Sequence, residues 1–213
     1  MQALEKTIDS NNWVTIILVV LLFCIFLLKG INSKKLEAIV FSFFNKNYIE
    51  EELEKRPSFL NSFNLILVFF STTVFSLLLY FFVISSLENS ETGFYFYIKI
   101  FFITCIYFFI KWGLELLIST LFLIKNEISF FLVSKITYLF VISFTLFIAI
   151  IFFSYTSLGI EFLTYFTLGL FILRTVLHLT NNKNLILSKL FYFILYLCAF
   201  EIAPLFVLFK LML

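Results

Sequence analysis

The sequence predicts an all-α membrane protein, a polytopic bundle of about six transmembrane helices. Of its 213 residues, 62% are hydrophobic and only 13% are charged, whereas soluble domains are about half apolar and about a quarter charged. The mean hydropathy is +1.10, and long stretches contain no charge at all. About 20 apolar residues in a helix cross roughly 30 Å of hydrocarbon. Because backbone groups in lipid must be satisfied within the segment, these stretches should be helical.

Six stretches are long and apolar enough to be spans. They are residues 13–28, 63–87, 94–124, 136–157, 161–179 and 190–209. The first ends before Lys29 and lacks a small-x-small cleavage site, so we expect it to be retained and not removed as a signal peptide. The third contains Lys111 and Glu115 and could form two shorter elements, whereas the fourth contains no charge. The fifth contains Arg174 and His178.

The sixth expected span, in the stretch "YLCAFEIAPLFVLFK", contains a carboxylate and a proline. Glu201 lies 12 residues after Lys189, which places it roughly 18 Å along a helix and therefore near the middle of the bilayer. Pro204 should kink this helix and free a backbone carbonyl about one turn earlier. That carbonyl would then be available to a cation or a polar side chain from another span.

The segment between the first two spans, residues 33–56, is expected to form an amphipathic helix followed by an acidic linker. Apolar residues recur at helical spacing at Leu36, Ile39, Val40, Phe43 and Phe44. Lysines on both sides suit anionic lipid headgroups, so this helix should lie in the cytoplasmic interface. The run "EEELEKRP" that follows is a solvated charge cluster, with docking of a partner as the alternative.

The distribution of basic residues predicts the orientation. Ten Lys and Arg residues fall in the loops on one side of the six spans and three on the other. Because basic loops stay in the cytoplasm, both termini are expected outside it, in the periplasm of a Gram-negative bacterium.

Six titratable residues are candidates for burial at membrane depth, and one of them, Glu161, sits at a span end and can reach water. For the other five, a charge at the bilayer centre costs about 2.5–3.5 kcal/mol. Lys111 and Glu115 are four residues apart, as are Arg174 and His178, so each pair shares one helix face. We expect Glu201 to pair with Lys111 or Arg174 across helices.

These residues allow two interpretations. In the first they form a buried polar network that fixes how the helices pack, without chemistry. In the second they form a proton or ion path, because ionisable residues inside a membrane favour a functional role. A cytoplasmic-side anion site made of Asn61, Asn64, Arg174 and His178 is a related hypothesis.

Other function classes lack their sequence signatures. Motifs for a catalytic serine, a zinc protease or a phosphate-binding loop are missing, and the chain has five Gly and one His. The three cysteines stand alone in apolar stretches, so neither disulfides nor a metal site is expected. A net charge of +2 without a basic face gives no reason to expect a nucleic-acid partner. We therefore expect no enzyme activity, no cofactor and no metal.

Three stretches resemble a known family. "RPSFLNSFN" before the second span, the polar fifth span, and "CAFEIAPLFVLFK" are similar to a family of Bacteroidota integral membrane proteins known as a domain of unknown function. The resemblance covers about residues 40 to 213, and the Glu-x-x-Pro stretch is its most specific part. It implies an inner-membrane location but no activity and no catalytic residues.

The sequence thus favours a non-enzymatic inner-membrane protein, a subunit or assembly factor of a larger envelope complex. Its expected partners are the lipid bilayer and a membrane protein or a second copy of the chain. The alternative is a small proton- or ion-coupled transporter component that uses Glu201 with Lys111 or Arg174. A third hypothesis is a lipid-linked enzyme or flippase-like protein that handles an anionic headgroup near Arg174.

Overall fold

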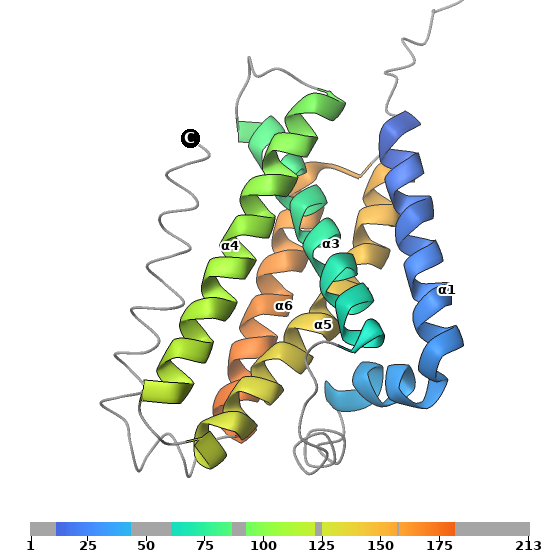
Figure 1. Cartoon of the computed structure of the whole chain (residues 1–213). Coiled ribbons are helices and arrows are strands. Elements are labelled where there is room, and N and C mark those ends of the chain that lie inside the picture. Colours follow the sequence, from blue (N-terminus) through green and yellow to red (C-terminus); the bar gives the residue numbers. More distant parts are fainter. Residues whose placement is uncertain (1–11, 44–60, 87–92, 122–124, 157, 182–213) are drawn as a thin grey trace, which may run out of the picture.

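The computed structural model describes residues 12–43, 61–86, 93–121, 125–156 and 158–181, and this part of the chain is all α-helical (Figure 1). Its elements are α1 (Asn12–Val40), the 3₁₀ turn η1 (Phe41–Phe43), α3 (Ser62–Ser86), α4 (Phe94–Leu121), α5 (Lys125–Tyr155) and α6 (Ile160–Asn181). Five of these helices are long and apolar enough to cross a membrane. The predicted all-α class is confirmed, and the five helices are compatible with a multi-pass membrane protein.

The helices correspond closely to five of the six expected spans. The third expected span, which could have been two elements, is one continuous helix, α4. The fourth is longer than expected, because α5 begins at Lys125 and not near residue 136. The sixth, residues 190–209, lies outside the described residues together with Glu201 and Pro204.

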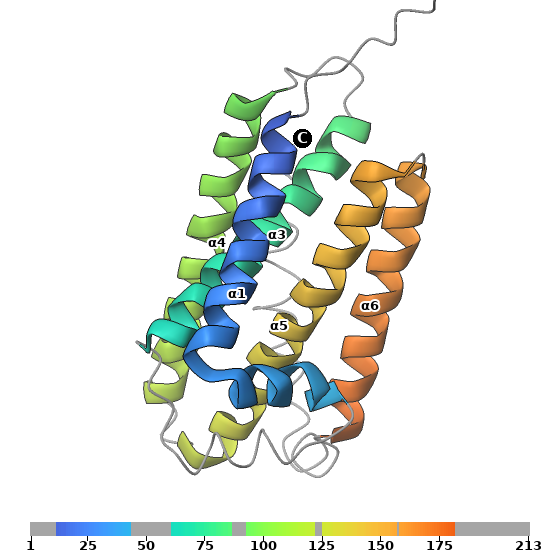
Figure 2. The ribbon, with the colours of Figure 1, turned by 90° about the vertical axis from the view of Figure 1, so that its right-hand side faces the viewer.

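Helix α1 contains a sharp elbow at Asn32. The backbone of Asn32 is non-helical, with φ −157° and ψ 91°, and its side-chain Oδ1 accepts a hydrogen bond from the N–H of Lys35 at 2.9 Å. Asn32 therefore acts as the N-cap of a second helical part. This part runs across the ends of the other helices (Figures 1 and 2).

The second part of α1 is helical within the segment for which the sequence predicts an amphipathic helix, and its place in the cytoplasmic interface stays a prediction. Leu36 and Ile39 pack against the helices beside it, in a cluster that includes Phe63 of α3. Val40, from the same expected face, is exposed. The acidic linker that was expected next lies outside the described residues.

Helix α3 forms the centre of the described bundle. It packs against α1, α4, α5 and α6, and its residues Ser71 to Leu78 are all buried. Helices α4 and α6 run in the same direction, and they lie toward opposite edges of the bundle with α3 and α5 between them (Figure 2). Each outer helix therefore packs through one face only.

Polar residues set the starts of two helices. The carbonyl oxygen of Asn61 accepts the first hydrogen bond of α3, from the N–H of Leu65 at 3.1 Å. The carbonyl of Gly93 does the same for Tyr97 of α4 at 3.2 Å. Gly93 has φ +151°, a conformation that side chains with a Cβ rarely adopt. It therefore allows the chain to enter α4 at this angle.

Candidate functional site

Four hydroxyl side chains lie together in the buried part of α3, and we call them the hydroxyl band: Ser71, Thr72, Thr73 and Ser76. Each donates a hydrogen bond to a backbone carbonyl three or four residues earlier in α3, at 2.8–2.9 Å. A serine or threonine can thus be buried in a helix without a partner from elsewhere. The hydroxyl groups of the band therefore find hydrogen-bond acceptors within α3 itself.

Two members of the hydroxyl band also reach neighbouring helices. The hydroxyls of Ser71 and Ser143 of α5 share a hydrogen bond of 3.0 Å. The hydroxyls of Ser76 and Tyr97 of α4 share one of 3.1 Å. Small side chains at such positions let helix backbones approach closely, and hydrogen bonds between membrane helices add a modest stabilisation. The band therefore ties α3 to both neighbours.

Aromatic side chains gather at the end of the bundle opposite the elbow. Trp13 at the start of α1 lies edge-on to Tyr80 of α3, with 4.9 Å between ring centroids, and 5.3 Å from the ring of Tyr97. Phe94, the first residue of α4, lies 5.9 Å from Trp13. Trp and Tyr concentrate where a bilayer meets water. This cluster is consistent with that position.

A second aromatic contact joins three helices deeper in the bundle. Phe75 of α3 lies 5.8 Å from Phe108 of α4 and 6.4 Å from Phe171 of α6, measured between ring centroids. We call these three residues the phenylalanine layer. Because α4 and α6 run in the same direction (Figure 1), residues just after Phe108 and Phe171 lie on the same side of this layer.

Lys111 and Arg174, two of the residues predicted from the sequence, occupy equivalent places beside this layer. Each follows a layer residue by three positions, about one helical turn. Both side chains are half-buried. The ammonium of Lys111 lies 5.7 Å from the centroid of the Tyr107 ring, close enough for a cation–π interaction.

Both cations continue the packed stripe of their helix. On α4 the stripe is Tyr97, Ile100, Thr104 and Phe108, and on α6 it is Leu163, Thr167 and Phe171. Members of a stripe recur every three or four residues and so share one face. Lys111 and Arg174 therefore lie on the faces that α4 and α6 turn toward the bundle.

The other predicted site residues are described less fully. Glu115 and His178 belong to α4 and α6, one turn beyond Lys111 and Arg174, but their side chains lie outside the described residues. At the start of α3, Asn61 is exposed, and Asn64 in the first turn is half-buried. The predicted pairing of Glu201 and the predicted anion site stay predictions.

The structure adds polar residues that sequence reasoning did not bring together. The pairing of Ser71 with Ser143 is one example. The sequence signal for the band is "STTVFS", four hydroxyl residues within six positions of an uncharged span. For metal binding, the described residues include no group of three or more His, Cys, Asp or Glu side chains that could hold an ion.

The comparison with protein families gives a clear result. Residues 14–212 match the family described as Domain of unknown function (DUF4271). The chain belongs to this family. The match begins at residue 14 and not near residue 40, so it includes the first helix as well as the stretches that suggested the family. No curated protein and no solved structure is significantly similar to the chain.

Proposed function

We propose that the protein is a non-enzymatic inner-membrane protein that serves as a subunit or assembly factor of a larger envelope complex. The observation that carries this proposal is the centre of the bundle. Helix α3 is enclosed by four helices, and the hydroxyl band at its middle is satisfied by hydrogen bonds. A centre filled by packed side chains suits a structural protein better than a conduit.

The outer helices support the same proposal. Tyr165 of α6 is 74% exposed, and large apolar side chains of α1 and α4 are exposed as well. Such surfaces face lipid or the helices of another membrane protein. In this proposal the chain has six spans, with residues 190–209 as the sixth, and both termini lie in the periplasm.

A second candidate function is favoured by the two cations beside the phenylalanine layer. Lys111 and Arg174 lie on inward faces of two helices that do not pack extensively against each other. Cations within a membrane span are stabilised by acids, backbone carbonyls or water. We propose that Glu201 of the sixth span is such an acid. The chain would then be a small proton- or ion-coupled transporter component if water reaches this group.

One experiment separates the two functions. The protein with its native sequence and the variant Glu201→Gln are purified in mild detergent, and co-purifying proteins are identified by mass spectrometry. The same proteins are reconstituted into vesicles for proton-flux measurements. A structural subunit should retain a defined membrane-protein partner in both forms and give no flux. Glu161→Gln is the matched control, because Glu161 is exposed in the first turn of α6.

The outcomes are distinct. Flux through the native protein that Glu201→Gln abolishes and Glu161→Gln leaves intact would establish the transporter and reject the structural proposal. A stable partner without flux supports the structural proposal. Purification as a single chain, with neither partner nor second copy, would contradict it.

A further inference from the structure

The elbow of α1 lies at the depth where a bilayer meets water. Helix α1 runs from Asn12 to Asn32 before it turns. About 20 residues at about 1.5 Å each give roughly 30 Å, the thickness of the hydrocarbon core. Trp13 begins this part, and Lys29 lies near its end. The helical part that follows Asn32 therefore lies along the interface.

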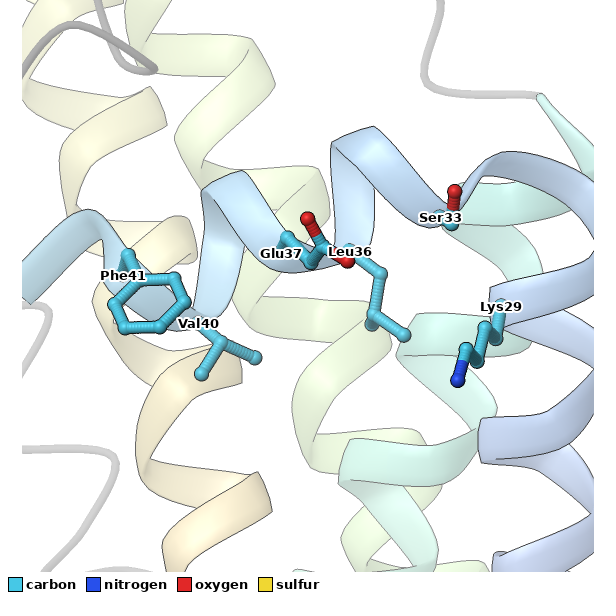
Figure 3. Close-up of a pocket in the computed structure, with 6 residues that line it drawn as sticks. All are labelled: Lys29, Ser33, Leu36, Glu37, Val40 and Phe41. Atoms are coloured by element: carbon cyan, nitrogen blue, oxygen red, sulfur yellow. The ribbon is translucent and has the colours of Figure 1, made fainter.

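A groove opens in the angle between the two parts of α1 (Figure 3). Its volume is about 230 Å³, and its walls are formed by Lys29, Ser33, Leu36, Glu37, Val40 and Phe41. The side chains of Lys29, Leu36 and Val40 extend into this angle (Figure 3). Val40 is 40% exposed and Phe41 62% exposed. In a membrane, an apolar wall at this depth is covered by lipid chains.

The groove carries one charge of each sign. Lys29 lies on the first part of α1 and Glu37 on the second, and both are exposed. Among the described residues no ion pair joins them. Ser33 also lines the groove, but its hydroxyl points away from the ammonium of Lys29 (Figure 3). Lys34 and Lys35 do not line the groove, and the ammonium of Lys35 lies 5.3 Å from the centroid of the Phe63 ring on α3.

We propose that this groove binds a phospholipid with an ethanolamine headgroup. The phosphate lies at the ammonium of Lys29, and the headgroup ammonium lies at the carboxylate of Glu37. One acyl chain covers Leu36 and Val40. Charge complementarity favours this lipid, because a phosphoglycerol headgroup offers no cation to Glu37 and a choline headgroup cannot donate a hydrogen bond to it.

The test uses the full chain in nanodiscs made from equal amounts of phosphatidylethanolamine, phosphatidylglycerol and phosphatidylcholine. Lipids that stay bound after release into detergent are counted by native mass spectrometry. The native sequence should retain phosphatidylethanolamine in preference to both others. Lys29→Gln should lower this retention roughly tenfold, as expected for the loss of one charge-assisted hydrogen bond. Glu37→Gln should remove the preference for ethanolamine over glycerol while a phospholipid stays bound.

Lys34→Gln is the matched control, because Lys34 is an exposed neighbour outside the groove. It should leave retention unchanged. Preference of the native protein for phosphatidylglycerol, or equal losses in Lys29→Gln and Lys34→Gln, would overturn the proposal. Melting temperatures of all variants are measured in parallel.

Discussion

Helix α3 and the pair of helices α4 and α6 bury polar groups in opposite ways. The polar groups at the middle of α3 are hydroxyls, enclosed on all sides and bonded to carbonyls of their own helix. Helices α4 and α6 pack through one stripe each, and that stripe includes Lys111 and Arg174. The polar groups thus differ both in type and in the number of helices that surround them.

This difference shows which part of the fold is complete in itself. A hydroxyl in a membrane helix can satisfy itself locally, so its burial requires no other segment. A charged group cannot, because its burial is costly unless an opposite charge or water meets it. The centre of the bundle is therefore specified by α3 and its immediate neighbours. The cations in the α4 and α6 stripes depend on other groups.

The largest expected effect tests whether α3 is the centre. Phe70 is fully buried and contacts Phe144 and Phe147 of α5, with centroid distances of 4.8 and 5.6 Å. Phe70→Ala should lower the free energy of unfolding by about 3 kcal/mol, the lower end of the range for a Phe-to-Ala cavity. The lower end applies because a side chain that leaves the centre of a membrane protein meets apolar lipid instead of water. Reversible unfolding in SDS measures the change.

The neighbouring residue provides the matched control. Phe69 is 46% exposed and makes one edge contact with Phe101 of α4. Phe69→Ala should cost much less, because no enclosed cavity forms. Equal losses for Phe69→Ala and Phe70→Ala would mean that α3 is not enclosed in the way described.

The second prediction concerns the narrow packing face of an outer helix. Thr104 on α4 is 1% exposed and faces the bundle, whereas Cys105 beside it is exposed. Thr104→Leu inserts volume into a packed site and should destabilise the protein by about 1–3 kcal/mol. Cys105→Leu should be close to neutral in the same SDS titration. The opposite order would reverse the assignment of the two faces of α4.

Much of this architecture is predictable from the sequence, for a simple physical reason. A helix in lipid must satisfy its backbone internally, so length and apolar composition fix where helices lie, as with α3 and α6. The elbow was only partly predictable. The amphipathic pattern after Asn32 indicated a second helical part, but not that a single non-helical residue, Asn32, separates it from the first.

The sequence predicted which residue types form the candidate site, but not which side chains pair across helices. Lys111 and Arg174 stand out in a sequence because charge is rare in spans, and their i, i+3 relation to Phe108 and Phe171 gives their face. Which hydroxyl meets which depends on the rotation and register of two helices. A single sequence does not state this, so the bond between Ser71 and Ser143 appears only in the fold.

The third prediction applies to the elbow of α1, whose geometry depends more on a local hydrogen bond than on burial by surrounding helices. Asn32→Ala removes the side-chain acceptor of the Lys35 N–H and should cost about 1 kcal/mol. Asn32→Asp keeps an acceptor and should retain most of the stability. Melting temperatures in detergent compare the two. If both variants behave like the native protein, the cap does not hold the elbow.

The smallest expected effect isolates the hydrogen bond between Ser71 and Ser143. A double-mutant cycle of Ser71→Ala and Ser143→Ala should give a coupling of about 0.6 kcal/mol, the average measured between membrane helices. The value stays small because each hydroxyl has a single proton, and a carbonyl of its own helix, 2.9 Å from Ser71 and 2.7 Å from Ser143, competes for that proton. A coupling well above that average would mean that the inter-helix bond dominates.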